Sequence, residues 1–302
     1  MAPSATPESL GQDRVSGRLL RSSAKQSYDP EVDLDWDAPL VDGMWFMQPE
    51  RMSLYGTATW DRLADEQRIE LSKHEVASIA SVGLWFELIL MQMVVRDLYD
   101  EDPRSERAQY ALTEIGDECR HSTMFGRAIA RCGVPAYGAP PHTHRLGRAF
   151  KSVAGGVSAY ASILVAEEIL DRWQRELMRD ERVQPLIRMV SRIHVLEEAR
   201  HMTFARDEIE RRLTGLSASQ RAWHAFWTGQ VSLFVARSLV NPQVYAAVGL
   251  DPRETRREAL ANPHYQATMA WMGEKVTGYL AGQGLIPASQ RPVWRRSLLL
   301  AS

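Results

Sequence analysis

A five-residue pattern, acid-Glu-x-Arg-His, occurs twice in this chain, eighty positions apart. The first copy is Asp117-Glu118-Cys119-Arg120-His121 and the second is Glu197-Glu198-Ala199-Arg200-His201. A glutamate and a histidine three positions apart project from nearly the same face of a helix, so each copy can offer a carboxylate oxygen and an imidazole nitrogen to one metal ion. A single Glu-x-x-His arises easily by chance, but two copies that share the flanking acid and arginine predict two helices that face a common metal centre.

Apolar residues recur at helical spacing over most of the chain, without an alternating β pattern or a glycine-rich phosphate loop. A built-in nicotinamide or nucleotide domain is therefore disfavoured. A loop over 134–144 and an irregular tail over the last twenty residues are expected. The predicted helices cover about 65–98, 102–131, 146–178 (or from after Gly156), 185–213 and 217–240, followed by shorter ones at 251–261 and 263–281.

The N-terminal part of the chain divides into two stretches. Residues 1–35 are polar and rich in Ser, Pro and Arg, which predicts a flexible arm, free or ordered only by contact with the core. The stretch that follows contains Trp36, Trp45, Phe46 and Tyr55, which would pin an irregular segment onto a helical body. The predicted organisation is an N-terminal arm over 1–35 and a single all-α domain over 36–302.

Composition excludes several classes of function. With 302 residues, 45% of them hydrophobic, the chain can bury a large core, and 36 basic against 38 acidic residues give no electrostatic case for binding nucleic acid or an anionic membrane. Two cysteines are too few for a disulfide framework, and the first residues lack the charged region followed by an apolar region that is typical of a secretory signal. A cytoplasmic protein is therefore expected. The longest apolar stretch, Val82–Val95, is too short to span a bilayer and contains Glu87.

Two further glutamates are needed to complete a dinuclear site in a four-helix bundle, one from each of the two remaining helices. On the helix over 65–98, Glu75 lies in a polar turn whereas Glu87 lies within an apolar run, so Glu87 is favoured; a salt bridge there is the alternative. On the helix that ends near 178, both Glu167 and Glu168 follow an apolar run, and Glu167 is favoured.

Several residues beside the repeat have two interpretations. Arg120 and Arg200 either form ordinary surface ion pairs or, through Asp117 and Glu197, orient a ligating histidine. Cys119 is expected to be a small buried side chain next to the site. His194 precedes Glu198 by four positions and His201 by seven, so it either reaches the same metal or is hydrogen-bonded to a neighbour.

At these residues the sequence resembles the diiron arylamine N-oxygenases typified by p-aminobenzoate N-oxygenase, a branch of the ferritin-like diiron carboxylate proteins. The segments that carry the likeness are SLYGTATWDRL, EQRIELSKHEVASIASVGLWFE, DECRHSTMFGRA and RIHVLEEARHMTFARDEI. The resemblance implies a ferritin-like four-helix bundle core with additional C-terminal helices. It also implies that His194 joins the iron ligands, which would then be Glu87, Glu118, His121, Glu167, His194, Glu198 and His201. Two iron ions suit this donor set, and an Fe/Mn pair is the alternative.

The resemblance further implies an O2-dependent monooxygenase that converts an aromatic amine to hydroxylamine, nitroso or nitro products in secondary metabolism. No catalytic residue beyond the metal ligands is predicted, and with no nucleotide fold in the chain the electrons would come from an external reductase or carrier. A diiron C–H hydroxylase acting on a biosynthetic intermediate and a non-enzymatic iron-handling bundle are the alternatives. A homodimer is expected because residues 217–240 are more apolar than one helix face requires, with Trp223, Phe226, Trp227, Leu233, Phe234 and Val235.

Overall fold

The computed structural model describes residues 7–301, and within this range every regular element is a helix. The elements in chain order are α1 (Pro7–Lys25), α2 (Pro30–Asp33), η1 (Pro49–Arg51), α3 (Ala58–Arg62), α4 (Asp65–Leu98), α5 (Glu106–Cys132), α6 (Pro141–Val153), α7 (Gly156–Leu177), α8 (Pro185–Leu213), α9 (Ala218–Ser238), η2 (Pro242–Val248), α10 (Pro252–Ala261), α11 (Pro263–Gly282) and α12 (Arg291–Ser297). The all-α fold class is confirmed, and it is consistent with a ferritin-like bundle.

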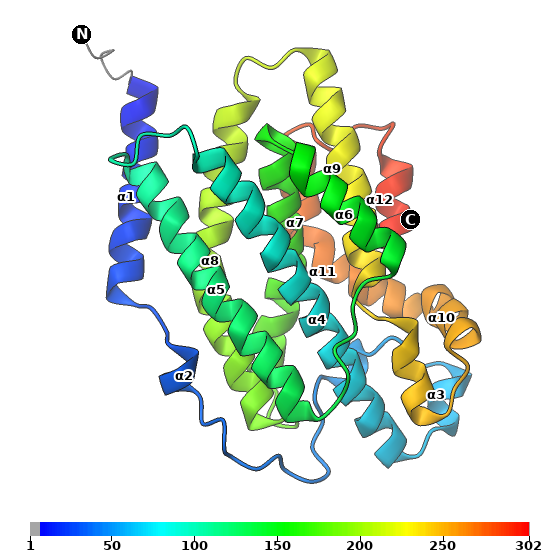
Figure 1. The fold of residues 1–302 in the computed structure, drawn as a ribbon. Coiled ribbons are helices and arrows are strands. Elements are labelled where there is room, and N and C mark those ends of the chain that lie inside the picture. The colour runs from blue at the N-terminus through cyan, green and yellow to red at the C-terminus, as the bar shows by residue number, and fades with distance from the viewer. Residues whose placement is uncertain (1–6, 302) are drawn as a thin grey trace.

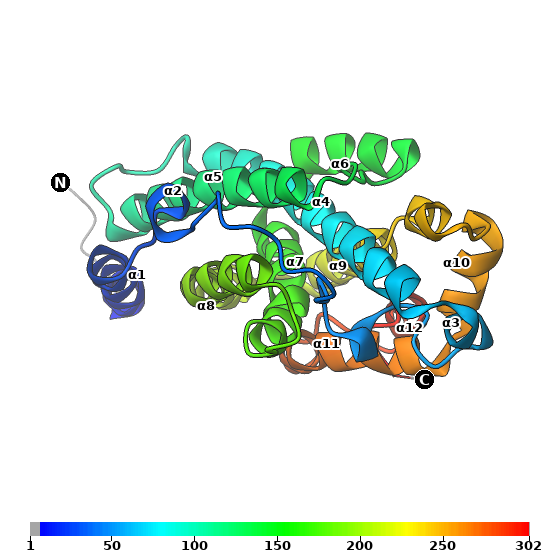
Figure 2. The ribbon, with the colours of Figure 1, turned by 90° about the horizontal axis from the view of Figure 1, so that it is seen from below.

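Four long helices, α4, α5, α7 and α8, form the central bundle (Figure 1). Helix α4 packs mainly on α5, and α7 packs mainly on α8, which gives the two layers seen end-on in Figure 2. Helices α9 and α11 pack against α7, and α12 packs against α9. The additional C-terminal helices that the resemblance implied are therefore present, and α9 and α11 cover the α7 side of the bundle.

The bundle helices begin and end at strong sequence signals. Helices α4 and α8 have the predicted bounds, 65–98 and 185–213. The hydroxyl of Ser105 caps α5 by accepting a hydrogen bond from the Ala108 amide, and Gly133, with φ of 68°, ends that helix in a left-handed turn. These local signals fix the positions of the two Glu-x-x-His motifs along their helices.

Two expectations about loops are wrong. The stretch 134–144 is not a loop throughout, because α6 begins at Pro141, whose missing N–H costs nothing at the first turn of a helix. Of the two starts predicted for the third helix, the one after Gly156 agrees with α7, which begins at Gly156 with φ of 58°, and α6 is a separate helix that ends at Val153. The C-terminal tail is not irregular throughout either: it contains α12, whose fully buried Trp294 packs against Gly229 of α9.

The N-terminal segment is more ordered than a flexible arm over its described part. Helix α1 contacts α5 and α8, and over residues 14–25, the part whose burial is described, its buried residues are Ser16, Gly17, Leu19 and Ser23. Only Leu19 among them is strongly apolar, so this face carries little hydrophobic signal in the sequence.

A buried cluster of charged residues joins all four bundle helices near one end. Asp97 of α4 accepts hydrogen bonds from Arg107 of α5 (3.0 Å) and from the Tyr160 hydroxyl of α7 (2.8 Å). Glu208 of α8 accepts a hydrogen bond from Arg107 (2.6 Å), and Arg212 of α8 bonds both acids. Because every carboxylate in the cluster has an arginine partner, the cluster holds the four helices in register without an unpaired charge.

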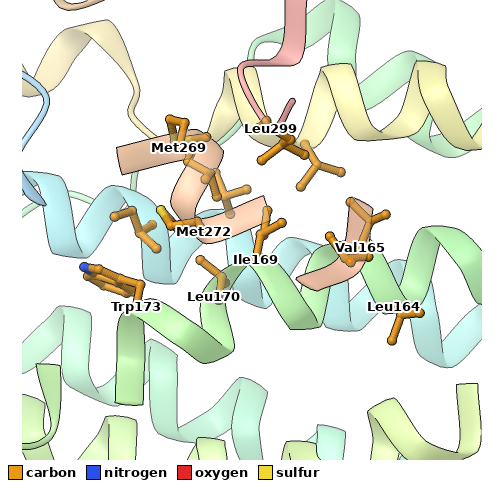
Figure 3. Close-up of a cluster of buried hydrophobic side chains, with 14 of the residues drawn as sticks. Leu164, Val165, Ile169, Leu170, Trp173, Met269, Met272 and Leu299 are labelled. Atoms are coloured by element: carbon orange, nitrogen blue, oxygen red, sulfur yellow. The ribbon is translucent and has the colours of Figure 1, made fainter. Parts of the chain in front are cut away.

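The apolar core lies between α7 and the helices that cover it. Figure 3 shows Val165, Ile169, Leu170 and Trp173 of α7 beside Met269, Met272 and Leu299, all of which are buried. Helix α4 is long and apolar enough by composition to cross a membrane, but 56% of its most apolar window is buried in the fold, as in the core helix of a soluble protein.

Candidate metal centre

The bundle brings all seven predicted ligands into its interior. Glu87 comes from α4, Glu118 and His121 from α5, Glu167 from α7, and His194, Glu198 and His201 from α8. Each of the seven residues is 6% exposed or less. The two copies of the repeat thus lie on α5 and α8, which face each other across the bundle, and the four helices together supply four carboxylates and three imidazoles.

The two Glu-x-x-His motifs form one compact group. Potential ligand atoms of Glu118, His121, Glu198 and His201 all lie within 4.8 Å of one another. The Nδ1 atom of His201 lies 2.8 Å from Glu118 Oε1 and 3.3 Å from Glu198 Oε1. The Nδ1 atom of His121 lies 3.2 Å from Glu118 Oε2 and 3.2 Å from Glu198 Oε1. Both imidazoles therefore present Nδ1 to the same pair of carboxylates.

A second group contains Glu87, His194 and Glu198, and it shares Glu198 with the first. His194 Nε2 lies 3.3 Å from Glu198 Oε1 and 3.7 Å from Glu87 Oε1. The other ring nitrogen, Nδ1, lies 2.7 Å from Oε1 of Gln174 on α7. An amide oxygen only accepts, so Nδ1 carries the hydrogen and Nε2 presents a lone pair to the two carboxylates.

Glu75 and Glu168, the alternatives to Glu87 and Glu167, each bond a partner outside the two compact groups. Glu75 accepts hydrogen bonds from the Ser53 backbone N–H (3.1 Å) and hydroxyl (2.5 Å), so its carboxylate is occupied away from the site. Glu168 pairs with Arg206, whereas both oxygens of Glu167 are buried and lack a hydrogen-bond partner among the described residues. Glu167 faces the site without belonging to either compact group.

The acid that precedes each Glu-x-x-His bonds the histidine of the other copy. His121 Nε2 lies 2.9 Å from Glu197 Oε2, and His201 Nε2 lies 3.1 Å from Asp117 Oδ2. Since an ionised carboxylate only accepts, Nε2 carries the hydrogen in both rings, and each Nδ1 is directed at the shared carboxylates. Arg200 contacts both acids, and Arg120 pairs with Asp117. The arginines of the repeat therefore act on the histidines through Asp117 and Glu197.

Buried charge dominates the electrostatics of this region. Burial, together with the carboxylates of Glu118 and Glu198, raises the pKa of Glu87 well above its ordinary value. Burial alone would lower the pKa of His121, but hydrogen bonds to Glu118 and Glu197 raise it well above the usual range. Four ionised carboxylates in this volume would repel one another strongly, and two divalent cations would balance their charge.

Atoms without hydrogen bonds show whether the donor set fits a pair of cations. Among the described residues, seven buried atoms of the site have no hydrogen-bond partner: Glu118 Oε1, both carboxylate oxygens of Glu167 and of Glu198, His194 Nε2 and His201 Nδ1. Such groups are costly to bury unless something binds them. Oxygen and imidazole donors in this ratio suit first-row divalent metals. The site is thus compatible with two metal ions.

Three features of the site did not emerge from sequence reasoning. Gln174 bonds His194 across two helices, a contact without any local sequence signal. Glu114 lies one turn before Glu118 on the same buried face, and burial raises its pKa to about 8. Its spacing of four residues from Glu118 could have predicted this position. Cys119 was expected to be buried, but it is exposed, with Sγ 3.5 Å from Met91 Sδ. Adjacent residues of a helix point in different directions, so Cys119 points outward where Glu118 points inward.

An apolar cavity of about 150 Å³ opens onto one wall of the site. Glu87, Glu167 and His194 form that wall, and the remaining lining comes from α4, α6, α7 and α9. Trp227, Phe234 and Val235 of α9 line the cavity, while Trp223 and Phe226 are exposed. Some of the apolar side chains of α9 that suggested a dimer interface therefore line the cavity instead.

A ferritin-like helical bundle whose four central helices gather carboxylates and imidazoles beside an apolar cavity has the architecture of the diiron carboxylate proteins. The chain belongs to the p-aminobenzoate N-oxygenase AurF family, an oxygenase family whose model matches residues 10–284. Its relatives include the uncharacterized proteins Rv0885 of Mycobacterium tuberculosis and Mb0909 of Mycobacterium bovis. Each is 28% identical over 287 residues, which cover 92% of this chain and 84% of the relative.

Proposed function

We propose that this protein is a non-haem diiron oxygenase that uses O2 to oxidise an aromatic amine to the hydroxylamine, nitroso or nitro level. The observation that carries the proposal is the pair of Glu/His groups that share Glu198, with the apolar cavity opening onto one of them. Membership of an oxygenase family supports it. The proposed ligands are Glu87, Glu118, His121, Glu167, His194, Glu198 and His201.

In this proposal the protein positions the ions and the substrate. Asp117 and Glu197 hold His201 and His121 with Nδ1 inward, and Gln174 holds His194 with Nε2 inward. The apolar lining excludes water from the reacting amine. The bound iron pair would supply O2 activation, which amino-acid side chains cannot provide. In the first step one oxygen atom of O2 enters an N–H bond to give the hydroxylamine, and the other leaves as water, which takes up two electrons from a separate reductase or carrier and two protons from solvent.

The wider context follows from the same proposal. We place the protein in the cytoplasm and assign the site to the domain of residues 36–302. The preceding segment also contacts the site: the backbone N–H of Tyr28 donates to Glu197 Oε1 (3.0 Å), and Arg200 donates to the Gln26 carbonyl (3.1 Å). The homodimer stays a prediction that now depends mainly on exposed Trp223 and Phe226, and light scattering of the purified protein would check it.

Replacement of Gln174 by leucine tests the orientation of His194. Without an acceptor at Nδ1, the ring is free to rotate or to change tautomer, so we expect affinity for one of the two irons to fall about 10–100-fold. Competition with a chelator measures this loss. Gln174→Glu keeps an acceptor oxygen and should retain more iron than Gln174→Leu; equal retention by wild type and Gln174→Leu would contradict ligation by His194.

Product analysis with isotope-labelled O2 tests the reaction. The iron-loaded, reduced protein should place labelled oxygen on the nitrogen of an arylamine, and the N,N-dimethylated analogue, which has no N–H bond, should give no such product. Label on a ring or aliphatic carbon instead would replace the N-oxygenase with a C–H hydroxylase. Iron oxidation that proceeds to a mineral without any substrate product would favour the iron-handling alternative.

A further inference from the structure

We propose that the cavity selects an uncharged, single-ring arylamine and rejects arylamines that carry a carboxylate, including p-aminobenzoate itself. This inference rests on the proposed function, because it assumes that the amine faces Glu87, Glu167 and His194. It goes further by assigning the chemical class of the rest of the substrate.

The first argument for this selectivity is the charge of the residues that line the cavity. Of the described residues that line the cavity, none is a lysine or arginine, and the only ionisable groups are Glu87, Glu167 and His194 on the metal-facing wall. The rest of the lining is apolar apart from Thr143, Ser162 and Gln230, so the para carboxylate of an amine directed at that wall would find no cation in the cavity. A carboxylate buried without a cation or hydrogen-bond donors is strongly disfavoured.

The uncharged polar groups of the lining indicate which substituents are tolerated. Thr143 on α6 and Gln230 on α9 line the cavity, and no hydrogen bond from either side chain is present among the described residues. Ser162 also lines it, but its hydroxyl already donates to the Ser158 carbonyl (2.6 Å). A hydroxyl and an amide can bond a neutral ester, amide or hydroxyl group without leaving a charge uncompensated.

The size of the cavity limits the substrate to one ring. Its volume is about 150 Å³, which matches a protein cavity known to hold a single benzene ring. Helix α6 forms one side and lies directly on α4: a Cβ at Gly147 would lie 2.7 Å from the Trp85 ring. Larger arenes would have to displace α6 from this contact.

Equilibrium binding without turnover tests the inference. Iron-loaded protein without reductant is titrated with p-aminobenzoate and with its methyl ester, which have the same ring and amine. Quenching of tryptophan fluorescence reports binding, since Trp85 and Trp227 line the cavity. We expect the ester to bind at least about 100-fold more tightly than the acid. Equal affinities, or tighter binding of the acid, would overturn the proposal.

Substitutions at Gln230 show whether the discrimination arises in this cavity. Gln230→Lys adds a cation to the lining, so we expect it to narrow the ester-to-acid ratio by at least about 10-fold. Gln230→Met, of similar size and without charge, should leave the ester preferred. A ratio that is the same in both variants and in the wild type would place binding elsewhere and contradict the proposal.

The two proposals fail in different ways. If the ester binds selectively but is never oxidised on nitrogen, the cavity assignment stands and the N-oxygenase reaction falls. If arylamines are oxidised but the acid binds as well as the ester, the reaction stands and the selectivity falls.

Discussion

Replacement of His121 or His201 by alanine should lower the iron content of the purified protein from about two ions per chain to less than about one. Each substitution removes an imidazole nitrogen that lies within 3.3 Å of the shared Glu198 carboxylate. It also removes one of the hydrogen bonds that Glu197 or Asp117 makes inside the bundle. Metal analysis of protein purified with and without added iron gives the result directly.

His264→Ala is the matched control for these variants. His264 is exposed, and its Nε2 bonds only the Glu50 backbone carbonyl (2.7 Å), so the iron content should not change. Circular dichroism at high metal concentration separates loss of ligands from loss of fold. If both histidine variants retained full iron, the repeat would have a purely structural role and the proposed centre would be wrong.

Replacement of Glu208 by glutamine should destabilise the fold by about 3–5 kcal/mol, because it removes the buried acid that Arg107 and Arg212 share. These arginine side chains are only 12% and 18% exposed, so water can solvate them only in part after the change. Urea unfolding measures the loss in free energy. Glu274→Gln, which removes a partner of Arg172 at a position 68% exposed, should cost less than about 1 kcal/mol.

The contribution of Glu208 should also depend on pH. Burial works to raise its pKa, but hydrogen bonds from Arg107 and Arg211 lower the pKa to about 2, below the ordinary value of 4.5. A folded-state pKa below the unfolded-state value stabilises the fold above the unfolded pKa, and this stability is lost as the pH falls toward the folded pKa. The stability gap between wild type and Glu208→Gln should therefore narrow below about pH 4.5. A constant gap between neutral and acidic pH would contradict this account.

Local sequence signals predict much of the fold. The bounds of α4 and α8 agree with the prediction because each helix has a long apolar period that only its own ends interrupt. The sequence left open whether the third helix begins near Leu146 or after Gly156 and did not identify α6 as a separate helix, because apolar residues continue on both sides of Gly156. Helix α1 was hidden because its buried face contains serines.

The candidate site likewise has features that the sequence predicts and features that depend on contacts between helices. The duplicated Glu-x-x-His and the apolar surroundings of Glu87 placed donors on helix faces from spacing alone. Spacing could not decide between Glu167 and Glu168, which are adjacent and both buried. The choice depends on Arg206, which lies on another helix and takes the carboxylate of Glu168.

By itself the sequence determined most of the long helices, the two repeated motifs and the donor atoms that these motifs offer to a metal, because hydrophobic period and ligand spacing are properties of one helix at a time. Only the tertiary structure decided that each acid of the repeat bonds the opposite histidine, that Gln174 orients His194, and that the cavity lacks a cation. Those features join side chains from different helices. The relative positions of these side chains depend on how the helices pack against one another. Residues throughout the chain contribute to that packing, so no local sequence pattern predicts it.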